Sequence, residues 1–172
     1  MLGEMSRTFT CRHEMDCTPE QFWERIHHNP QFNQELYVDL LGFGYELIED
    51  NRETGARRSH IVPKVDAPKA LIKALGDSVS FDEHGAVDRS GPAPVYRFNI
   101  IPGVWPDKIT VGGQMTVPEA PGGKCVRVVD FEVGCSVFGI GGLFERFVSK
   151  EVQKSYDQSA GFTNTFLQRH YG

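Results

Sequence analysis

The sequence predicts an α+β domain in which a curved antiparallel sheet of about seven strands surrounds a long C-terminal helix, with two short helices after the first strand. Three observations lead to this class. Apolar and polar residues alternate along several segments, strong Pro- and Gly-rich breakers separate those segments, and one helical pattern runs through residues 142–171. Alternation has the period of a half-buried strand, whereas the last segment keeps a helical period of about 3.6 residues. We expect residues 1–172 to form one domain.

The first strand is predicted over residues 7–15, where Phe9 and Met15 share one face. A helix should follow it at once. Thr18 can serve as N-cap, Pro19 suits the first helical position, and Gln21 completes a capping box.

This first helix is expected to end at His27 and His28, because the residue before Pro30 is disfavoured in a helix. We interpret the two histidines as a helix C-terminus that complements the helix dipole. A second short helix is predicted over residues 31–41. A small helical insert is predicted over residues 68–76, with proline at its start and glycine at its end. The remaining strands are predicted over residues 43–49, 56–62, 78–84, 95–101, 108–117 and 124–137.

Strand parity indicates which side chains face the long helix. In the last strand the odd positions from Cys125 to Val137 are mostly apolar, and Asp130 and Glu132 are even. The two preceding strands also have one apolar face each. A single helix covers only part of such a concave surface. Two interpretations therefore remain: the side chains meet in a solid core, or they leave a cavity. Gly113 and Gly134 could mark strand bends that open the concave side, or bulges without consequence.

The composition argues against several classes of function and indicates a location for the protein. The chain has 172 residues and a net charge of -5, and no basic stripe interleaved with aromatic residues, so nucleic-acid binding is not expected. Four cysteines lie without a C-x-x-C pair, which favours free thiols in a reducing compartment. Their spacing with His13 matches no zinc pattern, so we expect no metal and no cofactor. The first five residues have neither a basic nor an apolar segment typical of a secretory signal, and we expect a cytoplasmic protein.

The order of elements resembles the START-like superfamily, also called SRPBCC or helix-grip proteins. The similarity covers nearly the whole chain and is most recognisable in residues 10–24, where a strand runs into a Thr-Pro-Glu-Gln-Phe-Trp helix start. The insert at residues 68–76 and the Val-Ser-Phe-Asp-Glu segment after it look like a bacterial branch of the superfamily without an assigned function. The layout is distantly similar to PRELI-like phospholipid-transfer proteins. The resemblance implies a helix-grip fold with an internal cavity, but no particular substrate.

On this basis we expect a lipid or other largely apolar small molecule to bind between the sheet and the C-terminal helix. The residues predicted to contact it are Phe81, Tyr96, Phe98, Trp105, Met115, Arg127, Phe131, Val152 and Tyr156. Arg127 is the informative polar member, because a buried guanidinium needs a partner. A ligand phosphate or carboxylate would serve; alternatively Arg127 reaches water or pairs with an acidic side chain of the protein.

Two segments could form an entrance. Trp105 lies in a loop between strands, and residues 68–75 combine apolar side chains with Lys69 and Lys73. Together they could make a transient contact with an anionic membrane. The alternative is that Trp105 folds back onto the sheet and the short helix is a packed lid.

Two other function classes stay open. One is an enzyme of the polyketide cyclase or dehydratase kind, which some similar folds provide. It would need an acid–base pair in the pocket, with His13, Asp130, Glu49 or His60 as candidates. The other is a protein-interaction module like the co-chaperone members of the superfamily.

Overall fold

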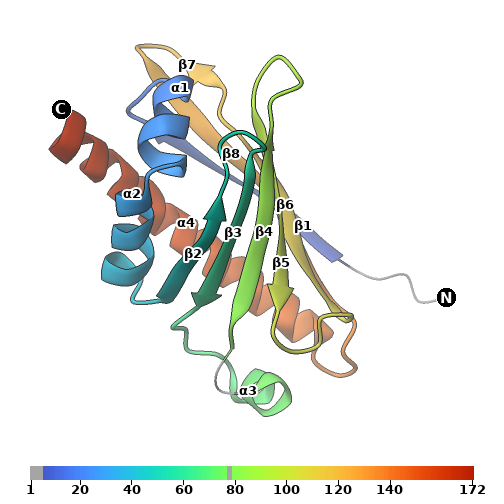
Figure 1. Cartoon of the computed structure of the whole chain (residues 1–172). Coiled ribbons are helices and arrows are strands. Elements are labelled where there is room, and N and C mark those ends of the chain that lie inside the picture. Colours follow the sequence, from blue (N-terminus) through green and yellow to red (C-terminus); the bar gives the residue numbers. More distant parts are fainter. Residues whose placement is uncertain (1–5, 77–78) are drawn as a thin grey trace.

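The computed structural model describes residues 6–76 and 79–172. Its centre is a curved antiparallel sheet with strands in the order β1-β8-β6-β5-β4-β3-β2. The long helix α4 (Gly141–Tyr171) crosses the concave side of this sheet (Figure 1). The strand bounds are β1 Ser6–Met15, β2 Gly44–Asp50, β3 Ala56–Val62, β4 Phe81–Asp88, β5 Val95–Pro102, β6 Ile109–Thr116, β7 Glu119–Ala120 and β8 Lys124–Cys135.

The predicted curved sheet of about seven strands is confirmed. Among the described residues, seven strands follow one another across the sheet, and the two residues of an eighth strand, β7, pair with the start of β8. The segment between Pro118 and Gly123 therefore contributes a short pairing besides its turn. Strand β4 begins at Phe81 and extends to Asp88, beyond the predicted end at His84. Ser78, the predicted first residue of that strand, lies outside the described residues.

The two short helices after β1 are confirmed, and each continues as a π-helix. Helix α1 (Pro19–Phe22) has the predicted capping box between Thr18 and Gln21, and it continues into η1 (Trp23–His27). Asn29 caps the second helix, α2 (Pro30–Gln34), which continues into η2 (Glu35–Leu40). The wider π turns extend both helices to the residues at which the sequence predicted their ends.

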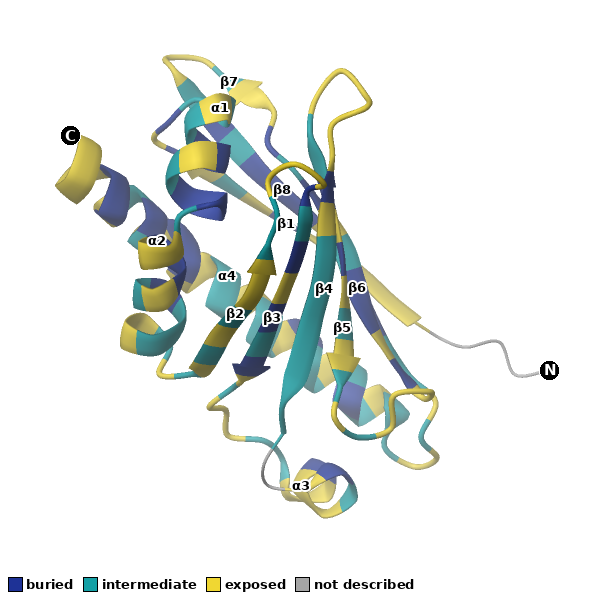
Figure 2. Cartoon of the chain, viewed as in Figure 1, coloured by how far each residue is buried: buried dark blue, intermediate teal, exposed yellow. Residues whose placement is uncertain are grey.

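The core divides into two clusters along α4. In the C-terminal half of the helix, Phe166 is 1% exposed and packs against Phe32 of α2, with ring centroids 5.2 Å apart. In the N-terminal half, Phe144 packs in a separate cluster with Leu71 and Leu75 of helix α3 (Lys69–Leu75). Figure 2 shows α3 beyond one end of the sheet. Between the two clusters the helix face that points at the sheet is only half-buried at Val152 and Tyr156.

The predicted inward faces of β5, β6 and β8 are confirmed by burial. Tyr96 and Phe98 are buried whereas Arg97 and Asn99 are exposed, and Asp130 and Glu132 of β8 are exposed as well. Strand pairing runs in continuous register through Gly113 and Gly134, so neither glycine is a bulge.

Gly113 is required by a close approach of neighbouring strands. A Cβ atom at this position would overlap the carbonyl oxygen of Asp130 and lie 3.1 Å from the ring of Phe98. A Cβ at Gly134 would have its nearest neighbour at 3.5 Å, an ordinary contact. The absence of a side chain at Gly113 therefore lets β6 follow the curvature of the sheet.

We predict that Gly113→Ala lowers the free energy of unfolding by about 1–3 kcal/mol, since an added methyl group must push backbone apart. Gly134→Ala is the matched control on the adjacent strand and should change it far less. Urea unfolding of both variants checks this. Equal losses in the two variants would contradict the close-approach argument.

Candidate ligand-binding site

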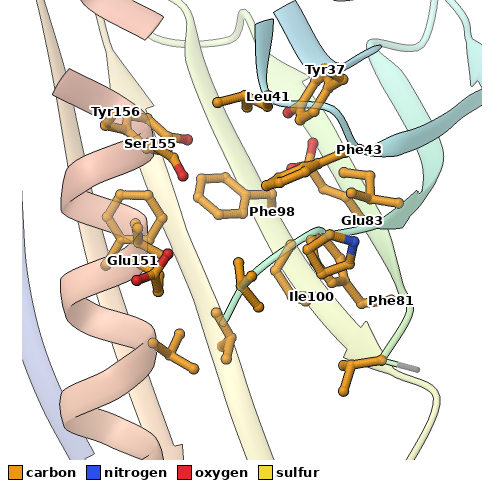
Figure 3. A pocket seen from close by; sticks show the side chains of 18 of the residues that line it. Tyr37, Leu41, Phe43, Phe81, Glu83, Phe98, Ile100, Glu151, Ser155 and Tyr156 are labelled. Atoms are coloured by element: carbon orange, nitrogen blue, oxygen red, sulfur yellow. The ribbon is translucent and has the colours of Figure 1, made fainter. Parts of the chain in front are cut away.

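A cavity of about 340 Å³ lies between the concave side of the sheet and α4. Strands β3, β4, β5, β6 and β8 form one wall, and α4 and the short helices complete it. Most of the surface that lines it is apolar. Figure 3 shows Phe98 and Ile100 of β5 on the sheet side and Tyr156 and Glu151 of α4 opposite them. The sequence left open whether this space is filled, and in the structure it is not.

The structure brings together all but one of the residues predicted to contact a ligand. Those that line the cavity are Phe81, Tyr96, Phe98, Met115, Arg127, Phe131, Val152 and Tyr156. Strand parity and the helical period were the signals that placed them on facing surfaces. Whether they bind a ligand remains a proposal.

Trp105 is not among the lining residues. It lies in the β5–β6 loop with a φ of 51°, and its side chain is 43% exposed. Its indole nitrogen donates a hydrogen bond to the carbonyl oxygen of Ala74 at 3.3 Å, so the loop is fastened to α3. Its neighbour Val104 does line the cavity.

Arg127 is buried, 6% exposed, and its terminal nitrogens have partners in the protein. They donate to the hydroxyl of Ser159 at 2.9 Å and to the carbonyl oxygen of Tyr156 at 3.0 Å, both on α4. One also lies 3.2 Å from Nδ1 of His13, whose Nε2 is 2.7 Å from Asp157. The guanidinium thus joins β8 to α4. It is buried from water, and within the residues that the structure describes it pairs with no acidic side chain and its Nε has no hydrogen-bond partner.

A second polar group lies on the opposite wall. The hydroxyl of Tyr96 donates to Oε2 of Glu83 at 2.7 Å, and both residues line the cavity. Arg57 of β3, 5% exposed, donates to the carbonyl oxygen of His27 and to the hydroxyl of Tyr45. Burial raises the pKa of Tyr96 and the charge of Glu83 raises it further, so this hydroxyl stays protonated.

The interpretation of His27 and His28 as a dipole-complementing helix end needs a correction. Helix η1 does end at His27, but both rings are buried. His27 packs on Tyr96 with ring centroids 4.7 Å apart, and His28 lies 3.2 Å from Asp50. Burial, followed by the charge of Arg57, holds the pKa of His27 well below its usual value, so its ring is neutral.

The structure does not bring the four acid–base candidates together in the cavity. His13, Asp130, Glu49 and His60 are all absent from its lining. Asp130 and Glu49 are exposed, and His60 pairs with Asp82 at 2.6 Å. Within residues 6–76 and 79–172, no group of three or more potential metal ligands was found.

The model of the DUF2505 family, described as a protein of unknown function, matches residues 10–167. The chain belongs to the DUF2505 family. No curated protein matches the DUF2505 chain.

Solved structures show that the DUF2505 chain has the START-like fold. A protein of Thermus thermophilus is 16% identical with a TM-score of 0.66, covering 96% of this chain and 100% of that one. Norcoclaurine synthase of Thalictrum flavum, in complex with dopamine and hydroxybenzaldehyde, is 12% identical with a TM-score of 0.67, covering 99% and 91%. A START superfamily protein of Mycobacterium smegmatis is 11% identical with a TM-score of 0.57, covering 94% and 97%.

Sequence reasoning missed part of the polar lining of the DUF2505 chain: Tyr37, Arg57, Glu83 and Glu151. A signal existed for Glu83, which has the parity of Phe81 on the same strand, and for Arg57, which has the parity of Ser59 and Ile61. Tyr37 carried no such signal, because its place depends on how η2 packs on the sheet.

We predict that His27 makes stability depend on pH. The folded pKa is below the unfolded value, so the unfolded chain binds the proton first and stability falls as pH decreases below about 6.5. The loss approaches about 1.4 kcal/mol per pH unit. His27→Phe should flatten this slope, whereas His170→Gln at the exposed end of α4 should not. Denaturant unfolding from neutral pH to pH values near 5 measures both. An unchanged slope in His27→Phe would disprove the assignment.

Proposed function

We propose that this protein binds a largely apolar small molecule, such as a single-chain lipid, in the cavity between the sheet and α4, and carries or senses it. The observation that carries the proposal is the cavity of about 340 Å³ with a mainly apolar lining. Ligand sites in proteins span roughly 300–1,000 Å³ and combine apolar walls with few polar groups. A volume near the lower end favours one acyl chain or a small ring system over a two-chain phospholipid.

The START-like fold supports the same proposal. Proteins with this fold include norcoclaurine synthase, whose structure holds dopamine and hydroxybenzaldehyde. The eight predicted ligand contacts that line the cavity are therefore proposed as the binding surface: Phe81, Tyr96, Phe98, Met115, Arg127, Phe131, Val152 and Tyr156. Free thiols at the buried Cys11, Cys17 and Cys125 support a reducing, cytoplasmic location as part of the proposal.

We predict that Val152→Trp fills the cavity and weakens binding of a single-chain lipid by roughly tenfold or more, because indole occupies ligand volume. Gln153→Trp, on the exposed face of the same helix, is the matched control and should bind as the wild type does. Native mass spectrometry of gently purified protein, with extraction and identification of any bound molecule, checks both variants. Equal occupancy of Val152→Trp and the control would place the ligand elsewhere. No ligand from the cell or from a lipid panel would refute the function.

We also propose a transient membrane contact at the end of the molecule where α3 lies. The β5–β6 loop and the β8–α4 loop lie at this same end (Figure 1). Phe138 is 100% exposed, Trp105 43% and Ile72 39%. Lys69, Lys73 and Lys108 are exposed in the same segments, which supports an anionic lipid surface over a neutral one. Among the described helices, none has the length and apolar character needed to cross a bilayer.

We predict that vesicles of phosphatidylcholine with phosphatidylserine co-sediment the protein better than phosphatidylcholine alone. Phe138→Ser should weaken this binding by roughly tenfold, since an apolar side chain then leaves the bilayer interface. Tyr171→Ser, 46% exposed on α4 at its C-terminal end, is the control and should sediment like the wild type. Equal sedimentation of Phe138→Ser and wild type would exclude this end as the contact.

A further inference from the structure

The polar side chains of the cavity gather around one part of it. Tyr156 and Ser155 approach from α4, and Tyr37 and Glu83 approach from η2 and β4 on the other side of the same space (Figure 3). The rest of the lining is largely apolar, including Phe98 beside this space. A ligand with one polar end would therefore be oriented with that end among these four residues.

The positive charges of the cavity wall are mostly engaged by the protein, although Nε of Arg127 has no hydrogen-bond partner among the described residues. The terminal nitrogens of Arg127 donate to α4 and contact His13, and its guanidinium also lies over the ring of Tyr156 at 4.7 Å. Arg57 is directed at the carbonyl oxygen of His27 and the hydroxyl of Tyr45. These interactions leave little donor capacity for an anionic ligand, which argues against the ligand phosphate or carboxylate considered for Arg127.

The acceptors of the cavity are not occupied in the same way. Glu83 accepts one hydrogen bond, from Tyr96. In the described part of the chain, no basic side chain lies within 4.0 Å of the carboxylate of Glu83 or Glu151. Tyr37 is held as a neutral phenol, because burial and then the charge of Glu83 raise its pKa well above the ordinary value. The charged group of this part of the cavity that is free for a ligand is therefore the carboxylate of Glu83, and the neutral phenol of Tyr37 can accept as well as donate a hydrogen bond.

We propose that this part of the cavity binds a protonated amine at the end of an otherwise apolar ligand, with Glu83 as the charged acceptor. The hydroxyl oxygens of Tyr37 and Tyr156 accept further hydrogen bonds from the same ammonium group. An ammonium group has three donors and needs several acceptors when it leaves water. A carboxylate in this position would be repelled by the negative charge of Glu83. The inference rests on the proposed function, because it specifies the ligand of that same cavity.

The test compares three ligands that share an unbranched alkyl chain and differ in their polar end group: decylamine, 1-decanol and decanoate. Each is titrated at neutral pH, below its aggregation concentration, by displacement of the neutral dye Nile red. Alkylamines are protonated under these conditions, since a lysine amine has a pKa of about 10.4. We expect decylamine to bind roughly 10- to 100-fold more tightly than decanoate, the range of a charge-assisted hydrogen bond. 1-Decanol should fall between them.

The variants assign the preference to Glu83. Glu83→Gln keeps the acceptor for Tyr96 and should bring decylamine down to the affinity of 1-decanol. Asp82→Asn makes the same kind of change one residue away, on the other face of β4, and should keep the preference. Tyr37→Phe should reduce the preference for decylamine in part. Thermal unfolding of each variant verifies the fold, and if Glu83→Gln does not fold, the partial loss in Tyr37→Phe decides.

Two outcomes would overturn the inference, and they differ in what they leave standing. If 1-decanol binds and decylamine has no advantage over decanoate, or Glu83→Gln keeps that advantage, the amine site is wrong and the apolar ligand site stands. If none of the three ligands binds, the proposed function fails and the amine site fails with it.

Discussion

The cavity depends on one constraint: a single helix must cover a sheet that curves away from it. Helix α4 is fastened to the sheet through its C-terminal half, where Ser159 accepts from Arg127 and Asn164 bonds to the backbone of Glu14 and Asp16. Its N-terminal end is held by a second apolar cluster, in which Phe144 joins residues of α3, β6 and β8. The residues between these attachments face open space because no further element fills it.

This arrangement also explains why the buried arginines are structural. A guanidinium without partners inside a protein is costly, and removing one partner of a buried charge is strongly destabilising. Arg127 donates to the carbonyl oxygen of Tyr156 and the hydroxyl of Ser159, and Arg57 to the carbonyl oxygen of His27 and the hydroxyl of Tyr45. They thereby fix α4 and η1 to the sheet. Glu83 accepts a hydrogen bond from Tyr96, but in the described portion of the chain no basic side chain lies within 4.0 Å of the carboxylates of Glu83 and Glu151. These carboxylates therefore remain available to a charged group of a ligand.

The solved structures show that proteins can have this fold while sharing few identical residues. Identities between 11% and 16% accompany TM-scores of 0.57 to 0.67 over nearly the whole chain. The fold follows from alternation, breakers and one long helix, which many sequences satisfy. The polar residues inside the cavity are free to differ, so the ligand must be argued from Glu83 and its neighbours and not from the fold.

The sequence by itself determined the order of elements, the facing of β5, β6 and β8 and the capping of α1, because each depends on local periodicity and local hydrogen bonds. It also placed Phe98, Phe131 and Tyr156 toward the same space. Only the tertiary structure decided that this space stays open, that Arg127 bonds to α4, and that Tyr37 and Glu83 line the same part of the cavity. These depend on the distance between a curved sheet and a straight helix, and on which side chains reach across it, neither of which is encoded in any single segment.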